Sequence, residues 1–161
     1  MKTTMLALDT STTCTGFAVY ENGKLVDYGC LDFDPKVPMD IRLEEIIDRI
    51  YTLIDKLNPQ IVVAEMTFAQ NSARNNVETQ KNLTLLLGAV WGKCVITGAY
   101  FHSFRASEWR KLVDSGKKPR KREELKKWSI DKVNSFLKTE INNDNISDAI
   151  LIGQAYVNLF S

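Results

Sequence analysis

The sequence of 161 residues contains a single histidine, three cysteines and no long apolar run. One histidine, His102, excludes metal sites built from several histidines and most Ser-His-Asp chemistry. Cys14, Cys30 and Cys94 lie far apart and form no CxxC pair, which argues against a disulfide framework or a zinc site and favours a reducing cytoplasm. The apolar runs are shorter than the ~18 residues of a membrane span, so we expect no signal peptide and no membrane partner.

Positive charge is concentrated in one segment. Between residues 105 and 132 there are eleven Lys and Arg against five Asp and Glu, although the whole chain has a net charge of only +1. This asymmetry predicts a basic face for an anionic partner such as DNA, because Lys and Arg neutralise backbone phosphates. The alternative is a solvated helix face, since Glu123 and Glu124 can pair along the helix. The residues that we expect to bind DNA here are Arg110, Lys117, Lys118, Arg120, Lys121 and Arg122.

The apolar pattern predicts an α/β fold in a single domain over residues 1–161. Strands are expected at 3–8, 16–20, 24–33, 60–64 and 100–104, and helices at 41–57, 77–97, 106–113, 120–137 and 147–159. Asn22-Gly23 predicts a hairpin between the second and third strands, and residues 66–76 are expected to form a polar loop. A hairpin meander followed by alternating helices and strands predicts a mixed five-stranded sheet flanked by helices, with the first and fourth strands as parallel neighbours.

Four acidic residues stand where the predicted elements can bring them together. Asp9 and Glu65 follow the first and fourth strands, so both carboxylates emerge at the carboxyl edge of parallel neighbours. Asp144 and Asp148 are four residues apart at the start of the last helix, with Ser147 as its expected N-cap, and can point the same way. Each acid alone has an ordinary interpretation as a turn or cap residue. Together they predict an oxygen-ligand site for Mg²⁺ or Mn²⁺, able to hold two ions ~4 Å apart for phosphodiester hydrolysis.

Three segments resemble the acidic motifs of the RuvC-type Holliday-junction resolvases. They are MLALDTST at 5–12 followed by TGFAV at 15–19, VVAEMTF at 62–68, and NISDAI at 145–150. The resemblance implies a ribonuclease-H-like fold, Mg²⁺ dependence, and Asp9, Glu65 and Asp148 as metal ligands. The family often has Asp or His three residues before the last acid, where this chain has Asn145. We favour the neighbouring Asp144 for that role, with a weaker Asn145 ligand as the alternative.

The same resemblance extends to the DNA and to a partner subunit. It implies a homodimer that makes paired nicks across a four-way junction, with much of the interface on the helix at 77–97. Phe68 matches a family aromatic at the junction centre, and its alternative role is a core residue. Arg110 and either Lys121 or Arg122 match basic residues beside the scissile phosphate. The basic, divergent character indicates a phage member, which would act in the cytoplasm of a bacterial host.

We therefore expect a structure-selective endonuclease that cuts branched DNA by two-metal-ion hydrolysis. The segment at 8–12 also resembles the opening of sugar-kinase-like ATPase folds and of the partner subunits for tRNA threonylcarbamoylation. The chain lacks the GxGxxG and Walker A phosphate loops, which weighs against a nucleotide-binding protein. A third hypothesis is a catalytically weak branched-DNA-binding module, for which Asn145 leaves room.

Overall fold

A five-stranded mixed sheet forms the centre of the protein. The computed structural model describes residues 2–66 and 76–161. The strands are β1 (Thr4–Asp9), β2 (Cys14–Glu21), β3 (Lys24–Asp32), β4 (Ile61–Glu65) and β5 (Tyr100–Phe104), in the order β3-β2-β1-β4-β5. β2 is antiparallel to both of its neighbours, whereas β4 is parallel to β1 and to β5. The predicted sheet and the predicted parallel pairing of the first and fourth strands are confirmed.

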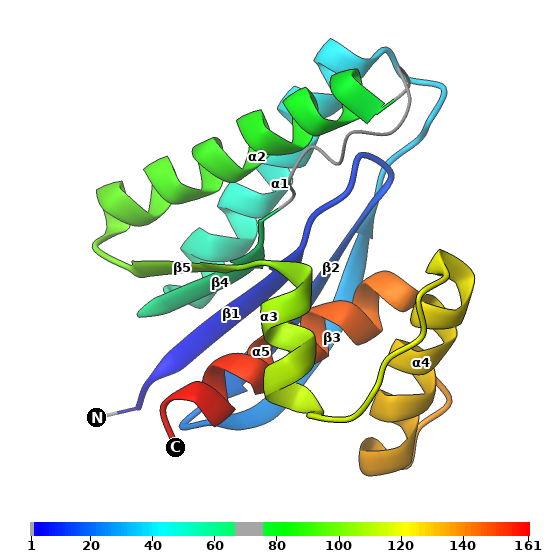
Figure 1. Cartoon of the computed structure of the whole chain (residues 1–161). Coiled ribbons are helices and arrows are strands. Elements are labelled where there is room, and N and C mark those ends of the chain that lie inside the picture. Colours follow the sequence, from blue (N-terminus) through cyan, green and yellow to red (C-terminus); the bar gives the residue numbers. More distant parts are fainter. Residues whose placement is uncertain (1, 67–75) are drawn as a thin grey trace.

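Helices cover both faces of the sheet, as Figure 1 shows. They are α1 (Met39–Leu57), α2 (Asn76–Thr97), α3 (Ala106–Val113), α4 (Arg122–Leu137) and α5 (Asp144–Leu159). α1 and α2 lie on one face, α3 and α5 on the other, and α4 packs against α5. A hydrophobic core lies on each face of the sheet, and alternate residues of β1 pack into one or the other. Leu6 and Leu8 pack toward α1 and α2, whereas Met5 and Ala7 pack toward α5.

The hairpin between β2 and β3 forms at the predicted position. Asn22 and Gly23 have positive φ angles of 51° and 76°, as the two central residues of a type I′ turn require. The backbone N–H of Asn22 also donates to the carbonyl of Thr3 at 2.9 Å. This hydrogen bond joins the hairpin turn to the start of β1.

α5 approaches β2 closely because two glycines leave room for it. A Cβ atom on Gly16 would overlap the main-chain carbonyl of Asn145, in the first turn of α5. A Cβ atom on Gly153 would overlap the ring of Tyr20, whose hydroxyl donates to the carbonyl of Ile150 at 2.6 Å. The first contact holds the acidic end of α5 against the sheet.

α5 begins three residues earlier than the sequence pattern predicts. Its N-cap is Asn143, whose side-chain oxygen accepts hydrogen bonds from the backbone N–H groups of Asn145 and Ile146 at 2.9 and 3.2 Å. The expectation that Ser147 caps this helix is wrong, because Ser147 is buried in the second turn and donates to the carbonyl of Asn143. An Asn cap already satisfies the amides of the first turn.

Cys14 and Cys30 are joined by a disulfide bond, contrary to the expectation from the sequence. The antiparallel register pairs Gly16 with Cys30 and brings the two cysteine Cα atoms to 6.2 Å, within the range that a disulfide spans. The spacing along the chain does not reveal this neighbourhood, because strand pairing creates it. Cys94 is a buried free thiol.

Candidate active site

Four acidic side chains line one cleft. The parallel register of β1 and β4 ends at the pair Leu8 and Ala64, and the next residues, Asp9 and Glu65, are the last of the two strands. α5 adds Asp144 and Asp148 from its first two turns. The four acids line a cavity of about 660 Å³. The structure thus brings together the acidic residues predicted from the sequence.

Burial and repulsion between neighbouring carboxylates raise the pKa values of acids in the cleft. Burial, followed by repulsion from Asp148, Glu65 and Asp144, raises the pKa of Asp9 well above its usual range. Burial also raises the pKa of Asp148 to about 7, with repulsion from Glu65 and Asp144 adding to it. Burial is thus the main reason that Asp9 and Asp148 hold a proton more tightly than usual, and the neighbouring carboxylates add to it.

The chemistry of this donor set suits a divalent cation, but no three of the four acids have ligand oxygens within 4.8 Å of one another in this structure. The four acids offer carboxylate oxygens, no histidine lines the cleft among the described residues, and hard cations such as Mg²⁺ and Mn²⁺ prefer oxygen ligands. Asp144 is close enough to raise the pKa of both Asp9 and Asp148. That proximity favours Asp144 over Asn145 as the fourth ligand, although Asn145 also lines the cleft.

Three further residues contact the acids and were not identified from the sequence. Trp109 Nε1 donates to Glu65 Oε2 at 2.6 Å, and Ser129 Oγ donates to Asp148 Oδ1. Lys126 Nζ lies 3.6 Å from Asp144 Oδ2. Helical spacing could have indicated part of this group, since residues 122, 126, 129 and 133 share one face of α4. No sequence signal links Trp109 to Glu65.

The structure divides the predicted basic residues into two groups. Arg110, Arg120 and Arg122 line the cleft together with the acids, and Lys126 joins them. Arg110 also lowers the pKa of Asp9, Glu65 and Asp148.

Lys117, Lys118 and Lys121 do not line this cleft. Lys117 is exposed, and Lys118 Nζ donates to the carbonyls of Asp114 and Gly116. Lys121 lies 3.9 Å from Glu124 on the surface. Phe68, predicted to contact the junction centre, lies outside the described residues.

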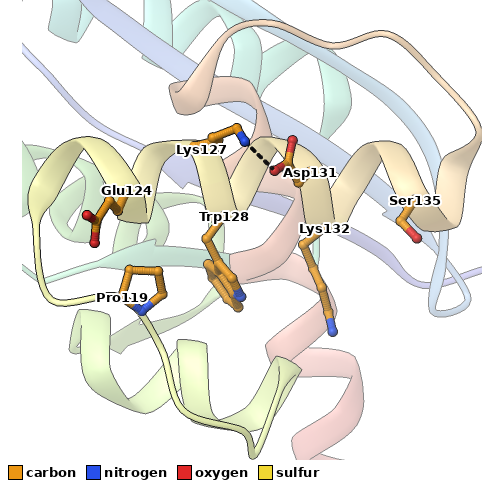
Figure 2. A pocket seen from close by; sticks show the side chains of 7 residues that line it. All are labelled: Pro119, Glu124, Lys127, Trp128, Asp131, Lys132 and Ser135. Carbon is orange, nitrogen blue, oxygen red and sulfur yellow. Dashed lines mark ion pairs between the residues drawn. The ribbon is translucent and has the colours of Figure 1, made fainter.

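A second hollow of about 520 Å³ lies on the opposite face of α4. Figure 2 shows its lining, in which Trp128 and Pro119 are surrounded by charged residues of both signs, with an ion pair between Lys127 and Asp131. Its acids, Glu124 and Asp131, are exposed rather than clustered. The acidic cleft is therefore the better candidate for chemistry.

A family model described as crossover junction endodeoxyribonuclease RuvC matches residues 5–155. The chain belongs to the RuvC family. The RuvC proteins of Desulforamulus reducens and Magnetococcus marinus are 29% identical over 91 residues and 25% identical over 99 residues. These alignments cover 53% and 59% of this chain and 56% and 51% of the two proteins. The chain thus spans about half the length of these curated relatives.

Solved structures of RuvC-type proteins share the fold. T. thermophilus RuvC in complex with Holliday junction substrate has a TM-score of 0.73 at 16% identity, covering 98% of this chain and 94% of that one. The yeast mitochondrial Holliday junction resolvase Ydc2 has a TM-score of 0.58 at 13% identity, covering 96% and 77%. The chain has the expected ribonuclease-H-like RuvC fold. RuvC membership favours a nuclease over the ATPase-like and threonylcarbamoylation alternatives.

Removing one buried charge should stabilise the metal-free protein. The folded state raises the pKa of Asp9 above its unfolded value, so the folded protein binds this proton more tightly and loses stability as pH rises through the acidic range. We expect Asp9→Asn in EDTA to raise the free energy of unfolding by about 1 kcal/mol at pH 8 and to change it little near pH 4. Thermal and urea unfolding measure this difference.

Asp131→Asn is the matched control, because Asp131 is exposed on α4. It should leave the pH dependence of unfolding unchanged. A loss of stability for Asp9→Asn at pH 8 in EDTA would contradict the repulsion described above.

Proposed function

We propose that this chain is a structure-selective DNA endonuclease that cuts Holliday junctions and related branched DNA. The observation that carries the proposal is the meeting of Asp9, Glu65, Asp144 and Asp148 in one cleft that arginines also line. Membership of the RuvC family supports the same activity. The four acids are proposed as ligands of two divalent cations, Mg²⁺ or Mn²⁺.

Each group of residues has a distinct task in this proposal. Cations bound to the acids would supply an activated water and stabilise the leaving oxygen of a phosphodiester. Arg110 lowers the pKa values of Asp9, Glu65 and Asp148 against the larger effect of burial, which favours the charged form that binds metal. Its guanidinium can also donate two parallel hydrogen bonds to a phosphate. Arg120 and Arg122 line the cleft from the α4 side and are proposed to bind the DNA backbone.

Loss of one acid should separate cutting from binding. We expect Asp9→Asn to reduce cleavage of a synthetic four-way junction in Mg²⁺ by ~100-fold or more, while junction affinity in EDTA stays within a few-fold. Gel mapping of the nicks on four-way, forked and linear duplexes measures the cleavage activity and the preference for each DNA structure. The exposed Asp131→Asn variant should cut like the unmodified protein. Full activity of Asp9→Asn would end the nuclease proposal.

The arginines of the cleft should set the salt dependence of DNA binding. Each phosphate contact contributes roughly 1 to the slope of log affinity against log salt. We expect Arg120→Ala combined with Arg122→Ala to reduce this slope by about 2. Lys24→Ala combined with Lys36→Ala is the control, because both lysines are exposed and neither lines the cleft. Equal slopes for both double variants would show that Arg120 and Arg122 do not contact the DNA backbone.

We also propose that two copies associate through α2. This helix exposes an apolar stripe in which Trp91, Val95 and Ile96 are 58%, 72% and 79% exposed, with Leu85 a turn and a half before them. Gly88 and Gly92 lie on the exposed side of α2, and a Cβ atom on either would meet nothing. An apolar helix face of this kind suits a self-complementary two-fold contact.

Charge placed on this stripe should dissociate the proposed dimer. We expect Val95→Glu combined with Ile96→Glu to weaken self-association ~100-fold or more, as measured by sedimentation equilibrium, and to turn paired nicks into single ones. Val26→Glu is the control, since Val26 is an exposed apolar residue on β3. A protein that is monomeric without any substitution would contradict the α2 interface.

We propose a phage origin and a site of action in the cytoplasm of the bacterial host, where its DNA substrate would be. The Cys14–Cys30 bond removes the cysteine pattern as support for this location. The low identity to the two curated bacterial relatives supports a divergent member. No helix in the described part of the chain is long and apolar enough to cross a membrane.

A further inference from the structure

Two of the four acids are held from the core side by neutral donors. The indole N–H of Trp109 donates to Glu65 Oε2 at 2.6 Å, and the hydroxyl of Ser129 donates to Asp148 Oδ1. Trp109 and Ser129 are 0% and 1% exposed, whereas Glu65 and Asp148 are partly exposed and line the cleft. The donors therefore approach each carboxylate from behind, away from the side that opens to the cleft.

The chemistry of these donors suits the orientation of a metal ligand. An indole N–H can only donate, so the oxygen that it contacts must act as an acceptor. Both hydrogen bonds favour the charged form of the acid that accepts them, against the effect of burial. A Lys or Arg in the same place would neutralise the carboxylate and compete with a cation. A neutral donor fixes the carboxylate and leaves its charge intact.

α3 and α4 repeat this arrangement. α3 presents Trp109 to the back of the acidic cluster and the adjacent Arg110 to the cleft. α4 presents Ser129 to the back and Lys126, one turn earlier, to the cleft. Trp109 belongs to the hydrophobic core and Ser129 is a buried polar residue of α4, so the packing of both helices fixes where the two donors lie.

We propose that Trp109 and Ser129 are positioning residues, each of which fixes one oxygen of Glu65 or Asp148 and leaves the other oxygen of that carboxylate available to a divalent cation. This inference rests on the proposed function, because it assigns the acids to a metal site. The partners of metal ligands typically change metal affinity 10- to 100-fold when they are lost, and that range is the size of effect expected here.

The test measures Mn²⁺ affinity directly, by electron paramagnetic resonance of free Mn²⁺ against protein concentration. The variants are Trp109→Phe, which keeps an aromatic ring without the N–H, and Ser129→Ala, which removes only the hydroxyl. Ser129→Thr restores a hydroxyl and should restore affinity. If Trp109→Phe does not fold, benzothienylalanine at position 109 retains the bicyclic shape and lacks the donor.

Trp128→Phe and Ser135→Ala are the matched controls. Trp128 lies with its ring centroid 6.4 Å from that of Trp109, and Ser135 is on the same helix as Ser129, but both line the hollow on the far face of α4. We expect the two control variants to bind Mn²⁺ like the unmodified protein. We expect each test variant to bind it at least ~10-fold more weakly, with junction affinity in EDTA unchanged.

The outcomes separate this inference from the proposed function. If the unmodified protein and Asp9→Asn bind Mn²⁺ equally, the metal site itself is wrong and the inference falls with it. If Asp9→Asn loses Mn²⁺ while Trp109→Phe and Ser129→Ala retain full affinity, the metal site stands and the positioning role is refuted. Weaker binding in both test variants, with rescue by Ser129→Thr, supports the role.

Discussion

The crowding of four partly buried carboxyl groups at one edge of the sheet is the constraint on which the rest of the structure depends. Burial and repulsion between these groups raise the pKa values of Asp9 and Asp148, so the cluster is unfavourable without a compensating positive charge. The fold must therefore hold these groups together against their own electrostatics. β1, β4 and α5 supply the four acids, and residues between β1 and β2 also line the cleft.

Several separate contacts meet this requirement. Register between β1 and β4 fixes Asp9 beside Glu65, and Gly16 lets the first turn of α5 lie directly against β2. From the other side, buried donors on α3 and α4 reach the acids, and Arg110 offsets part of their charge. The same helices that complete the core therefore determine the geometry of the cleft.

The basic residues of this segment fall into two groups, according to whether they line the acidic cleft. Arg110, Arg120 and Arg122 line the acidic cleft, where a DNA backbone would have to pass to reach the acids. Lys118 and Lys121 instead contact groups of their own loop and helix. A high density of Lys and Arg in the sequence thus indicates a basic face, but only some of its members lie where chemistry is proposed.

The sequence by itself determined the strands and helices along the chain and the hairpin at Asn22-Gly23, because apolar periodicity and turn residues are local signals. It predicted that Asp9 lies near Glu65 through a general rule of topology, the right-handed crossover that makes their two strands parallel neighbours. It also indicated Asp144 and Asp148 as neighbours, since residues four apart share a helix face. Only the tertiary structure decided the Asn143 cap, the Cys14–Cys30 bond and the contacts of Trp109 and Ser129 with the acids. The disulfide bond and the two contacts join residues from separate elements, which come together only through strand pairing and helix packing. The cap was not predicted because several neighbouring polar residues can each cap a helix, and the local pattern does not decide between them.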